Sequence, residues 1–271
     1  MEFKIEIADI CALIKVDDAD FAQCLIADHY SNFLSDKEPS LWVRMDVRPV
    51  EEASLLDGTL KIIETSVIGE VLYFRGFDGD VEGKINLISG EAEGVTVRVS
   101  YRFDAFLRIL YSLWLVKSGG FLLHSAGSKD EKEAYVFFGV SGSGKTTVTK
   151  LSDDKVILSD ELVAVRAVNG RYQAHGTPFM GEFARGGQNC SGDLKRIFLL
   201  KKDKKNFLLP IRGAQRLKEL FHCVQFFGEN THLLGDLLAI CNDISEKVDF
   251  YELHFLPDKS FWNCIRNHGG I

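Results

Sequence analysis

The chain has 271 residues, 46% of them hydrophobic and 26% charged, so it can bury a sizeable core and is not disordered. A net charge of −7 and an isoelectric point near 5.6 argue against nucleic acid as its main partner. No apolar run approaches the ~18 residues that a membrane-spanning helix needs, and the acidic N-terminus does not resemble a signal peptide. The six cysteines lack metal-binding spacing, so we expect reduced thiols in a cytoplasmic protein without a membrane partner.

Residues 1–102 are expected to form a β-rich lobe. Short runs rich in β-branched and aromatic residues recur there, separated by Gly and Asp clusters such as residues 76–80. The runs are Phe3–Ile7, Trp42–Val47, Leu60–Ile63, Val71–Phe74, Lys84–Leu87 and Val95–Val99. Their spacing predicts an antiparallel sheet. No group of His, Cys or acidic residues in this lobe indicates chemistry.

The pattern changes near Tyr101. The apolar residues of Asp104–Lys117 predict a largely buried helix that ends at Gly119-Gly120. After it we expect strands at Phe121–Leu123, Tyr135–Phe138, Val156–Leu158, Leu162–Ala167, Arg171–Ala174 and Val248–Leu256. Helices are expected at Thr146–Leu151, Ala214–Phe221, His232–Ser245 and Lys259–Asn267. The basic run Lys201–Lys205 lies between two apolar runs, which favours a solvated hairpin turn over a binding patch.

One segment fits the phosphate-binding pattern G-x-x-x-x-G-K-[ST] at every fixed position. It consists of Gly139, Val140, Ser141, Gly142, Ser143, Gly144, Lys145 and Thr146, with Thr147 next in the chain. An expected strand precedes it and an expected helix follows, which is the order that phosphate binding requires. Glycines let the backbone N–H groups of such a loop point at an anion. The alternative is a Gly- and Ser-rich connection that contains Lys-Thr by chance.

Two side chains of this segment have expected roles toward ATP and Mg²⁺. Lys145 would reach the outer phosphates, and the Thr146 hydroxyl would ligate the metal ion. We expect Lys145 to face solvent when no ligand is bound, so that its replacement by alanine leaves the fold intact.

Two acids follow the expected strand that begins at Val156. Asp160 and Glu161 stand where phosphoryl-transfer sites carry the carboxylates that bind Mg²⁺ or take the proton of the incoming hydroxyl. An exposed turn is the alternative, since acids end many strands. The functional interpretation is favoured for Asp160, whereas the two are evenly balanced for Glu161.

His124 and Arg185 complete the candidate residues. We expect His124 at the end of its strand, where two adjacent strands ending at one rim would bring it near the phosphates. There it could pair with Asp160 or hold the transferring phosphoryl group. A histidine satisfied by backbone groups is the alternative. Arg185 lies in the Gly-rich segment between His175 and Gly192, where an arginine could stabilise transition-state charge. A plain surface loop is equally consistent with that segment.

Four pieces of the chain, taken in order, resemble the C-terminal family of HPr serine kinase/phosphorylases. They are residues 122–127 (LLHSAG), 138–147 (FGVSGSGKTT), 158–163 (LSDELV) and 176–182 (GTPFMGE). The resemblance covers roughly residues 105–256 and implies the nucleotide fold that this family shares with phosphoenolpyruvate carboxykinases. The shorter look-alikes in the family include kinases that act on peptide or free serine hydroxyls.

The resemblance assigns roles by position. His124 matches the histidine beside the phosphates, Gly139–Thr146 the nucleotide loop, and Asp160 the first of two acids that serve as base and metal partner. Glu161 stands where HPr kinases have a second Asp. The Glu-x-Arg-Gly signature of the bifunctional enzymes has no match here, which leaves phosphorolysis and HPr itself without support. HPr kinases are oligomers, so the resemblance allows a homo-oligomer, although nothing in these residues demonstrates assembly.

Together these observations predict an α/β protein. A mixed sheet would carry the phosphate loop in residues 103–271, preceded by the β-rich lobe of residues 1–102. The predicted function is an ATP-dependent kinase that transfers phosphate to a hydroxyl, with serine of a peptide, protein or small molecule as the expected acceptor. The alternatives are a nucleotide-binding regulator or assembly factor without turnover, and a simple ATPase.

Overall fold

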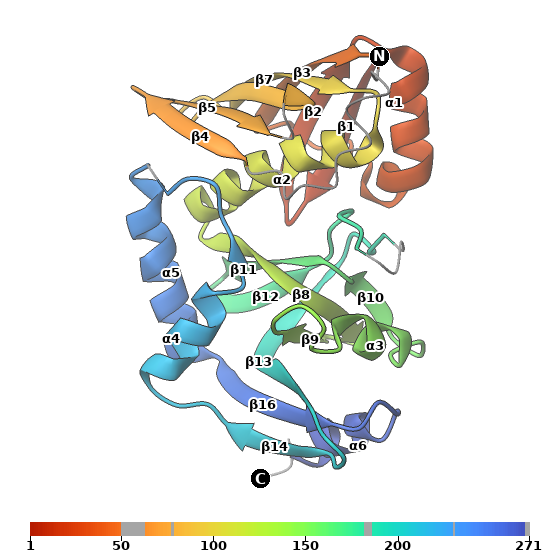
Figure 1. Cartoon of the computed structure of the whole chain (residues 1–271), viewed down its shortest axis with the longest axis vertical. Coiled ribbons are helices and arrows are strands. Elements are labelled where there is room, and N and C mark those ends of the chain that lie inside the picture. Colours follow the sequence, from red (N-terminus) through yellow and green to blue (C-terminus); the bar gives the residue numbers. More distant parts are fainter. Residues whose placement is uncertain (50–62, 77–78, 182–185, 230, 269–271) are drawn as a thin grey trace.

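A computed structural model describes residues 1–49, 63–76, 79–181, 186–229 and 231–268. In these residues the chain forms two mixed sheets with helices packed between and around them (Figure 1). The protein is therefore α/β with a mixed sheet architecture, as the sequence predicts. No helix in the described part of the chain is long and apolar enough to cross a membrane. All six cysteines fall within the described residues and carry free thiols.

The first sheet contains seven strands in the order β1-β2-β3-β7-β6-β5-β4. These strands are β1 (Glu2–Ile7), β2 (Ile10–Val16), β3 (Leu41–Arg48), β4 (Glu64–Ile68), β5 (Val71–Gly76), β6 (Val81–Asn86) and β7 (Glu91–Val97). Buried and exposed residues alternate along β3, so one face of the sheet packs on the core. The strand expected at Leu60–Ile63 lies outside the described residues except for Ile63.

The prediction of an antiparallel first sheet is wrong for its centre. There β2 pairs with β3, and β3 with β7, in parallel. Parallel neighbours need a crossover connection. Between β2 and β3 the crossover is made by α1 (Ala19–Leu25), a π-helical turn (Ile26–Tyr30) and a 3-10 turn (Ser31–Phe33). Only Asp18, whose side chain caps α1 by accepting from the Phe21 N–H, marks this short helix in the sequence.

Helix α2 (Ser100–Lys117) lies between the two sheets (Figure 1). It packs against β6 and β7 of the first sheet, and against β8 (Gly120–Asp130) and α5 (Leu233–Lys247) on its other side. A helix buried on most sides requires an almost continuous apolar sequence, which this segment has. One hydrophobic core includes residues of both sheets, and the predicted division after residue 102 falls within α2. That division stays a prediction.

The second sheet contains nine strands in the described residues. Besides β8 these are β9 (Glu133–Phe138), β10 (Val156–Ser159), β11 (Leu162–Val168), β12 (Arg171–His175), β13 (Ser191–Lys202), β14 (Phe207–Pro210), β15 (Val224–Gln225) and β16 (Asp249–Phe255). Pairings β8–β11, β11–β12, β12–β13, β13–β9 and β9–β8 close a ring of strands. The remaining helices are α3 (Lys145–Lys150), α4 (Ala214–Phe221) and α6 (Phe261–Asn267).

The basic run Lys201–Lys205 does not form a hairpin turn, so this prediction is wrong. It connects β13 to β14, and these strands both pair with β16 rather than with each other. The strand β16 comes from much later in the chain and lies between them. A local sequence pattern cannot reveal such an inserted strand, because its partner residues are distant in sequence.

Candidate nucleotide site

The site lies beside the middle of β8, where the neighbouring strands on both of its edges are interrupted. On one edge, Ser159 of β10 pairs with Gly127 and Leu162 of β11 pairs with His124, so Asp160 and Glu161 occupy the break between these strands. On the other edge, β9 ends at Phe138, which pairs with Ser125. The chain leaves the sheet there as the phosphate loop, by which we mean Gly139–Thr146.

His124 therefore approaches the loop for a different reason from the one expected. It is not at the end of its strand, because β8 continues to Asp130. Because β8 and β9 are antiparallel, the last residues of β9 lie beside the middle of β8, next to His124. The backbone N–H of His124 donates to the carbonyl of Cys223 at 2.8 Å, and its side chain is 43% exposed and faces the site.

The phosphate loop has the backbone that its glycines permit. Gly142 has φ 75° and Gly144 has φ 113°, a region that residues with a Cβ atom avoid. A Cβ at Gly144 would also lie 2.6 Å from the ring of Phe255. The loop ends at α3, which starts at Lys145.

The expectation that Lys145 faces solvent is wrong. Its side chain is folded into the loop, and the residue is only 9% exposed. The Nζ atom donates to the carbonyl oxygen of Gly139 at 2.9 Å and to that of Val140 at 3.4 Å. An ammonium group enclosed by the loop needs such acceptors, because a buried charge without partners is costly. Lys145 therefore supports the conformation of the loop as well as facing the cavity.

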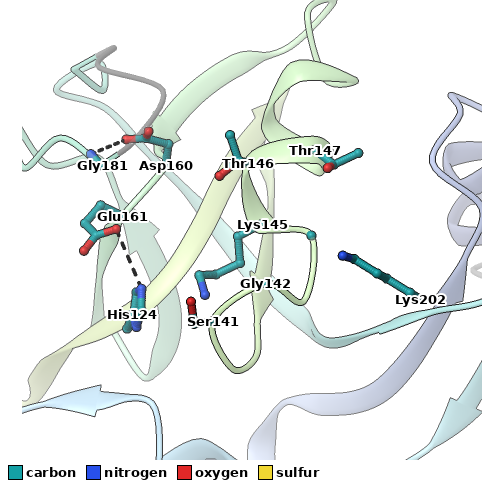
Figure 2. Close-up of a pocket in the computed structure, with 11 residues that line it drawn as sticks. His124, Ser141, Gly142, Lys145, Thr146, Thr147, Asp160, Glu161, Gly181 and Lys202 are labelled. Carbon is teal, nitrogen blue, oxygen red and sulfur yellow. Dashed lines mark hydrogen bonds and ion pairs between the residues drawn. The ribbon is translucent and has the colours of Figure 1, made fainter.

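A cavity of about 590 Å³ opens between the phosphate loop and the two acids (Figure 2). Its lining brings together nine of the predicted residues: His124, Ser141, Gly142, Gly144, Lys145, Thr146, Thr147, Asp160 and Glu161. We call it the phosphate cavity. Of the other loop residues, none lines the cavity: Gly139 and Ser143 are buried, and Val140 is 79% exposed. Arg185 lies outside the described residues.

The two acids have different surroundings. Asp160 is 4% exposed, and its Oδ1 atom accepts a hydrogen bond from the Gly181 N–H at 3.0 Å. Glu161 lies between two basic side chains, with Oε2 at 3.7 Å from His124 Nε2 and Oε1 at 3.7 Å from Arg108 Nη1. Figure 2 shows both acids on the same side of the cavity as His124.

The basic neighbours of Glu161 keep it ionised. Burial by itself would raise the pKa of Glu161, but the interaction with His124 and the charges of Arg108 and Lys145 outweigh it. The pKa of this carboxyl is therefore held below its ordinary value. Glu161 thus balances the basic groups around it, whereas Asp160 is held by a backbone N–H.

Three residues that sequence reasoning left without a role belong to this site. Lys202, at the end of β13, and Gly181 line the phosphate cavity, and Arg108 of α2 contacts Glu161. Lys202 carried a signal as part of the basic run, and Gly181 lies in the GTPFMGE segment. Arg108 carried no signal beyond being a charged residue in a buried apolar helix.

The cavity contains the donor types that Mg²⁺ takes in phosphoryl-transfer sites. In the described residues, no group of three or more His, Cys, Asp or Glu side chains could hold a metal ion alone. Mg²⁺ commonly uses one or two carboxylates and completes its coordination with water and substrate phosphates. The Thr146 hydroxyl and the Asp160 carboxylate line the same cavity and are oxygen donors of this kind. The residues present therefore fit a Mg²⁺ ion that arrives with a nucleotide.

Comparison with known proteins gives a distant structural likeness and no match at the level of sequence. No model of a protein family matches the chain. No curated protein matches it either. Among solved structures, it is similar to the Hpr(Ser) kinase/phosphatase from Coxiella burnetii, with 9% sequence identity and a TM-score of 0.31 over 55% of this chain and 90% of that one. This is a distant structural relationship, and the assignment of a function rests on the site itself.

Proposed function

We propose that this protein is an ATP-dependent kinase that transfers the γ-phosphoryl group to a hydroxyl, with serine as the expected acceptor. One observation carries the proposal: Lys145 and Thr146 of the phosphate loop line the same cavity as the Asp160 carboxylate. Phosphoryl transfer needs a group of donors that binds the phosphates and an acid beside the attacking hydroxyl. Here the phosphate loop follows β9 and Asp160 follows β10, and these two strands pair with opposite edges of β8.

The nucleotide phosphates would bind at the loop. Lys145 and Lys202 offer positive charge from two sides of the cavity (Figure 2). Charge-assisted hydrogen bonds to phosphate are about twice as strong as neutral ones. The Thr146 hydroxyl would hold Mg²⁺ directly and Asp160 would hold it through a coordinated water, and the ion supplies charge neutralisation on the phosphates. Glu161 remains a candidate second metal partner in this proposal, through its place beside Asp160.

Asp160 would act as the base. The acceptor oxygen forms a bond to the γ-phosphorus while the bond from that phosphorus to the bridging oxygen of ADP breaks, and the hydroxyl proton passes to the Asp160 carboxylate. The Gly181 N–H holds Oδ1 of this carboxylate and so directs its other oxygen, Oδ2. His124 and Arg108 would keep Glu161 ionised and in place. Arg185 remains a proposed source of transition-state charge stabilisation.

Following the label of [γ-³²P]ATP tests this function. The full chain is incubated with labelled ATP and Mg²⁺, alone and with a pool of serine-containing peptides, L-serine and glycerate. We expect label in an acceptor, and a loss of transfer of roughly 10²–10⁴-fold in Asp160→Asn, the usual range for a general base. Release of label as inorganic phosphate at the same rate without acceptor would instead identify an ATPase. Tight ATP binding with neither outcome would identify a nucleotide-binding regulator.

A further inference from the structure

A second cavity of about 410 Å³ adjoins the phosphate cavity. Its lining includes His29, Asp104, Arg108, Met180 and Gln225. These residues come from the π-helical turn, α2, the segment after β12, and β15, so the cavity lies beside α2, between the β2–β3 crossover and the second sheet. Its volume is within the range of small-molecule sites, about 300–1,000 Å³.

Arg108 lines the second cavity and contacts Glu161, which lines the phosphate cavity. Its Nη1 atom lies 3.7 Å from Glu161 in the phosphate cavity, and its Nη2 atom donates to the carbonyl oxygen of Met180 at 3.2 Å. Met180 lines the second cavity, and the next residue, Gly181, lines the first. Gln225, which also lines the second cavity, pairs with Leu122, two residues before His124 on β8. A molecule in the second cavity would therefore lie beside the residues proposed for phosphoryl transfer.

Two residues that line the second cavity carry a polar atom that the protein does not satisfy. Arg108 Nε and His29 Nδ1 are buried and have no hydrogen-bond partner in the described part of the chain. An arginine Nε–H can only donate, so it requires an oxygen acceptor. Asp104 accepts a hydrogen bond from the Tyr30 hydroxyl and keeps further acceptor capacity. Buried polar groups in proteins are nearly always paired, so a molecule bound in this cavity could satisfy groups that the protein itself leaves unpaired.

The charges in this cavity favour a partner without net charge. Asp104 and Arg108 are four residues apart on α2 and carry opposite charges. An oxygen acceptor for Arg108 and a nitrogen donor for Asp104 would satisfy both. Ile63, Ala105 and Phe227 supply the apolar part of the lining.

We propose that the second cavity binds the phosphoryl acceptor, as a hydroxyl-bearing group of no net charge with an oxygen acceptor beside a nitrogen donor. A free hydroxy amino acid presents this chemistry through its carboxylate and ammonium, and a serine residue within a peptide presents it through its amide groups. In either case the hydroxyl would have to reach Asp160, whose neighbour Glu161 contacts Arg108. This inference rests on the proposed kinase function, because it places the second substrate of that reaction.

Saturation-transfer NMR on the full chain tests the inference, with and without MgADP. The probes are L-serine, N-acetyl-L-serine amide and 1,3-propanediol, which has hydroxyls but no nitrogen donor or carbonyl. We expect saturation transfer to at least one of the two serine probes and much less to 1,3-propanediol. The serine probe that binds identifies the source of the acceptor. Absence of transfer to both serine probes, or equal transfer to all three, would overturn the inference.

Variants locate the binding. Ala105→Leu adds bulk inside the second cavity and should reduce saturation transfer roughly tenfold. Thr65→Leu adds similar bulk to a different cavity, on the first sheet, and should leave it unchanged. Arg108→Lys keeps the positive charge beside Glu161 but removes the Nε–H donor, so it should also reduce transfer and serves if Ala105→Leu does not fold. Unchanged transfer in a folded Ala105→Leu or Arg108→Lys protein would contradict the inference.

Titration with MgADP separates the two proposals. Ala105→Leu should bind MgADP within about twofold of the wild type, since Ala105 does not line the phosphate cavity. If the wild type fails to bind MgADP, the kinase function is wrong, whereas the probe measurements without nucleotide still report on the second cavity. If MgADP binds and the serine probes do not, only the acceptor site is wrong.

Discussion

The Nε2 atom of His124 lies 3.7 Å from the Oε2 atom of Glu161, so a histidine from the middle of β8 faces one of two neighbouring acids. The other acid, Asp160, instead accepts a hydrogen bond from the Gly181 N–H. Two adjacent carboxylates are thus placed in different surroundings, one among basic side chains and one at a backbone N–H. This difference gives each acid a separate predicted role.

Replacing each acid by its amide tests these roles. Asp160→Asn removes charge and basicity where the proton is transferred, so turnover should fall roughly 10²–10⁴-fold while ATP binding weakens much less. Glu161→Gln and His124→Ala disturb only the His124–Glu161 pair, which does not take the proton, so they should lower turnover by smaller factors. Steady-state kinetics of all three variants measure this. A larger loss in Glu161→Gln than in Asp160→Asn would mean that the roles of the acids are reversed.

Gly181 should be sensitive to a single methyl group. A Cβ at this position would lie 2.8 Å from Glu161 Oε2, 3.1 Å from Glu161 Cβ and 3.3 Å from Asp160 Oδ2, and the two oxygen atoms are the ends of flexible side chains. Gly181→Ala should therefore fold but displace both carboxylates, and we expect turnover to fall by roughly tenfold or more. Gly235→Ala on α5 is the matched control, because its Cβ would meet no atom within 4 Å. Full turnover in Gly181→Ala would show that the position of the acids does not limit the reaction.

Lys202 should contribute to nucleotide affinity. It lines the phosphate cavity from β13, outside the sequence motif, and its charge would face the phosphates. Lys202→Met should weaken MgATP binding by roughly tenfold, with a smaller effect at high salt because exposed charges are screened. Lys201→Met removes the same charge from the neighbouring residue, which does not line the cavity. Equal effects of the two substitutions would indicate only a general effect of net charge.

His175 should make the stability of the protein depend on pH. Burial lowers the pKa of His175 to about 4 from 6.5, although the charges of Asp9 and Glu6 oppose the shift. The folded-state pKa is below the unfolded value, so the unfolded chain binds the proton first as pH falls. The contribution of neutral His175 to the free energy of unfolding is therefore fully present above pH 6.5. It is lost progressively toward pH 4, by about 3 kcal/mol at most.

Urea unfolding at several pH values measures this dependence. His175→Gln should show a flatter dependence of the unfolding free energy on pH between 6.5 and 4, because the titrating group is absent. His222→Gln removes an exposed histidine and should keep the dependence of the wild type. If His175→Gln and the wild type lose stability in parallel over this range, His175 is not responsible.

Local patterns predicted the local parts of this structure. Ala214–Phe221 is a helix with the predicted bounds, and α2 begins four residues before the predicted start at Asp104. The phosphate loop follows a strand and precedes a helix, because its glycines and its flanking residues are all contained in one short segment. Such features are determined by residues that are close in sequence, so hydrophobic periodicity and turn residues predict them.

The parts that failed depend on partners distant in sequence. The parallel pairing of β2 with β3 requires the crossover through α1, and the place of Lys202 requires β16 to lie between β13 and β14. Arg108 belongs to a buried helix and acquires its position beside Glu161 only when α2 packs on the second sheet. The burial of Lys145 follows from its hydrogen bonds to loop carbonyls, which the motif does not specify.

The affinity for MgATP of the wild type and of Lys145 variants tests the central claim most directly. Isothermal titration calorimetry should show MgATP binding to the wild type and a loss of roughly ten- to hundredfold in Lys145→Ala, about 1.5–3 kcal/mol for a charge-assisted contact. Because Lys145 also donates to Gly139 and Val140, Lys145→Met retains the bulk of the side chain and should show a similar loss. Lys150→Ala, at the other end of α3, should bind like the wild type. Unchanged affinity in both Lys145 variants, or no binding by the wild type, would mean that this loop is not a nucleotide site.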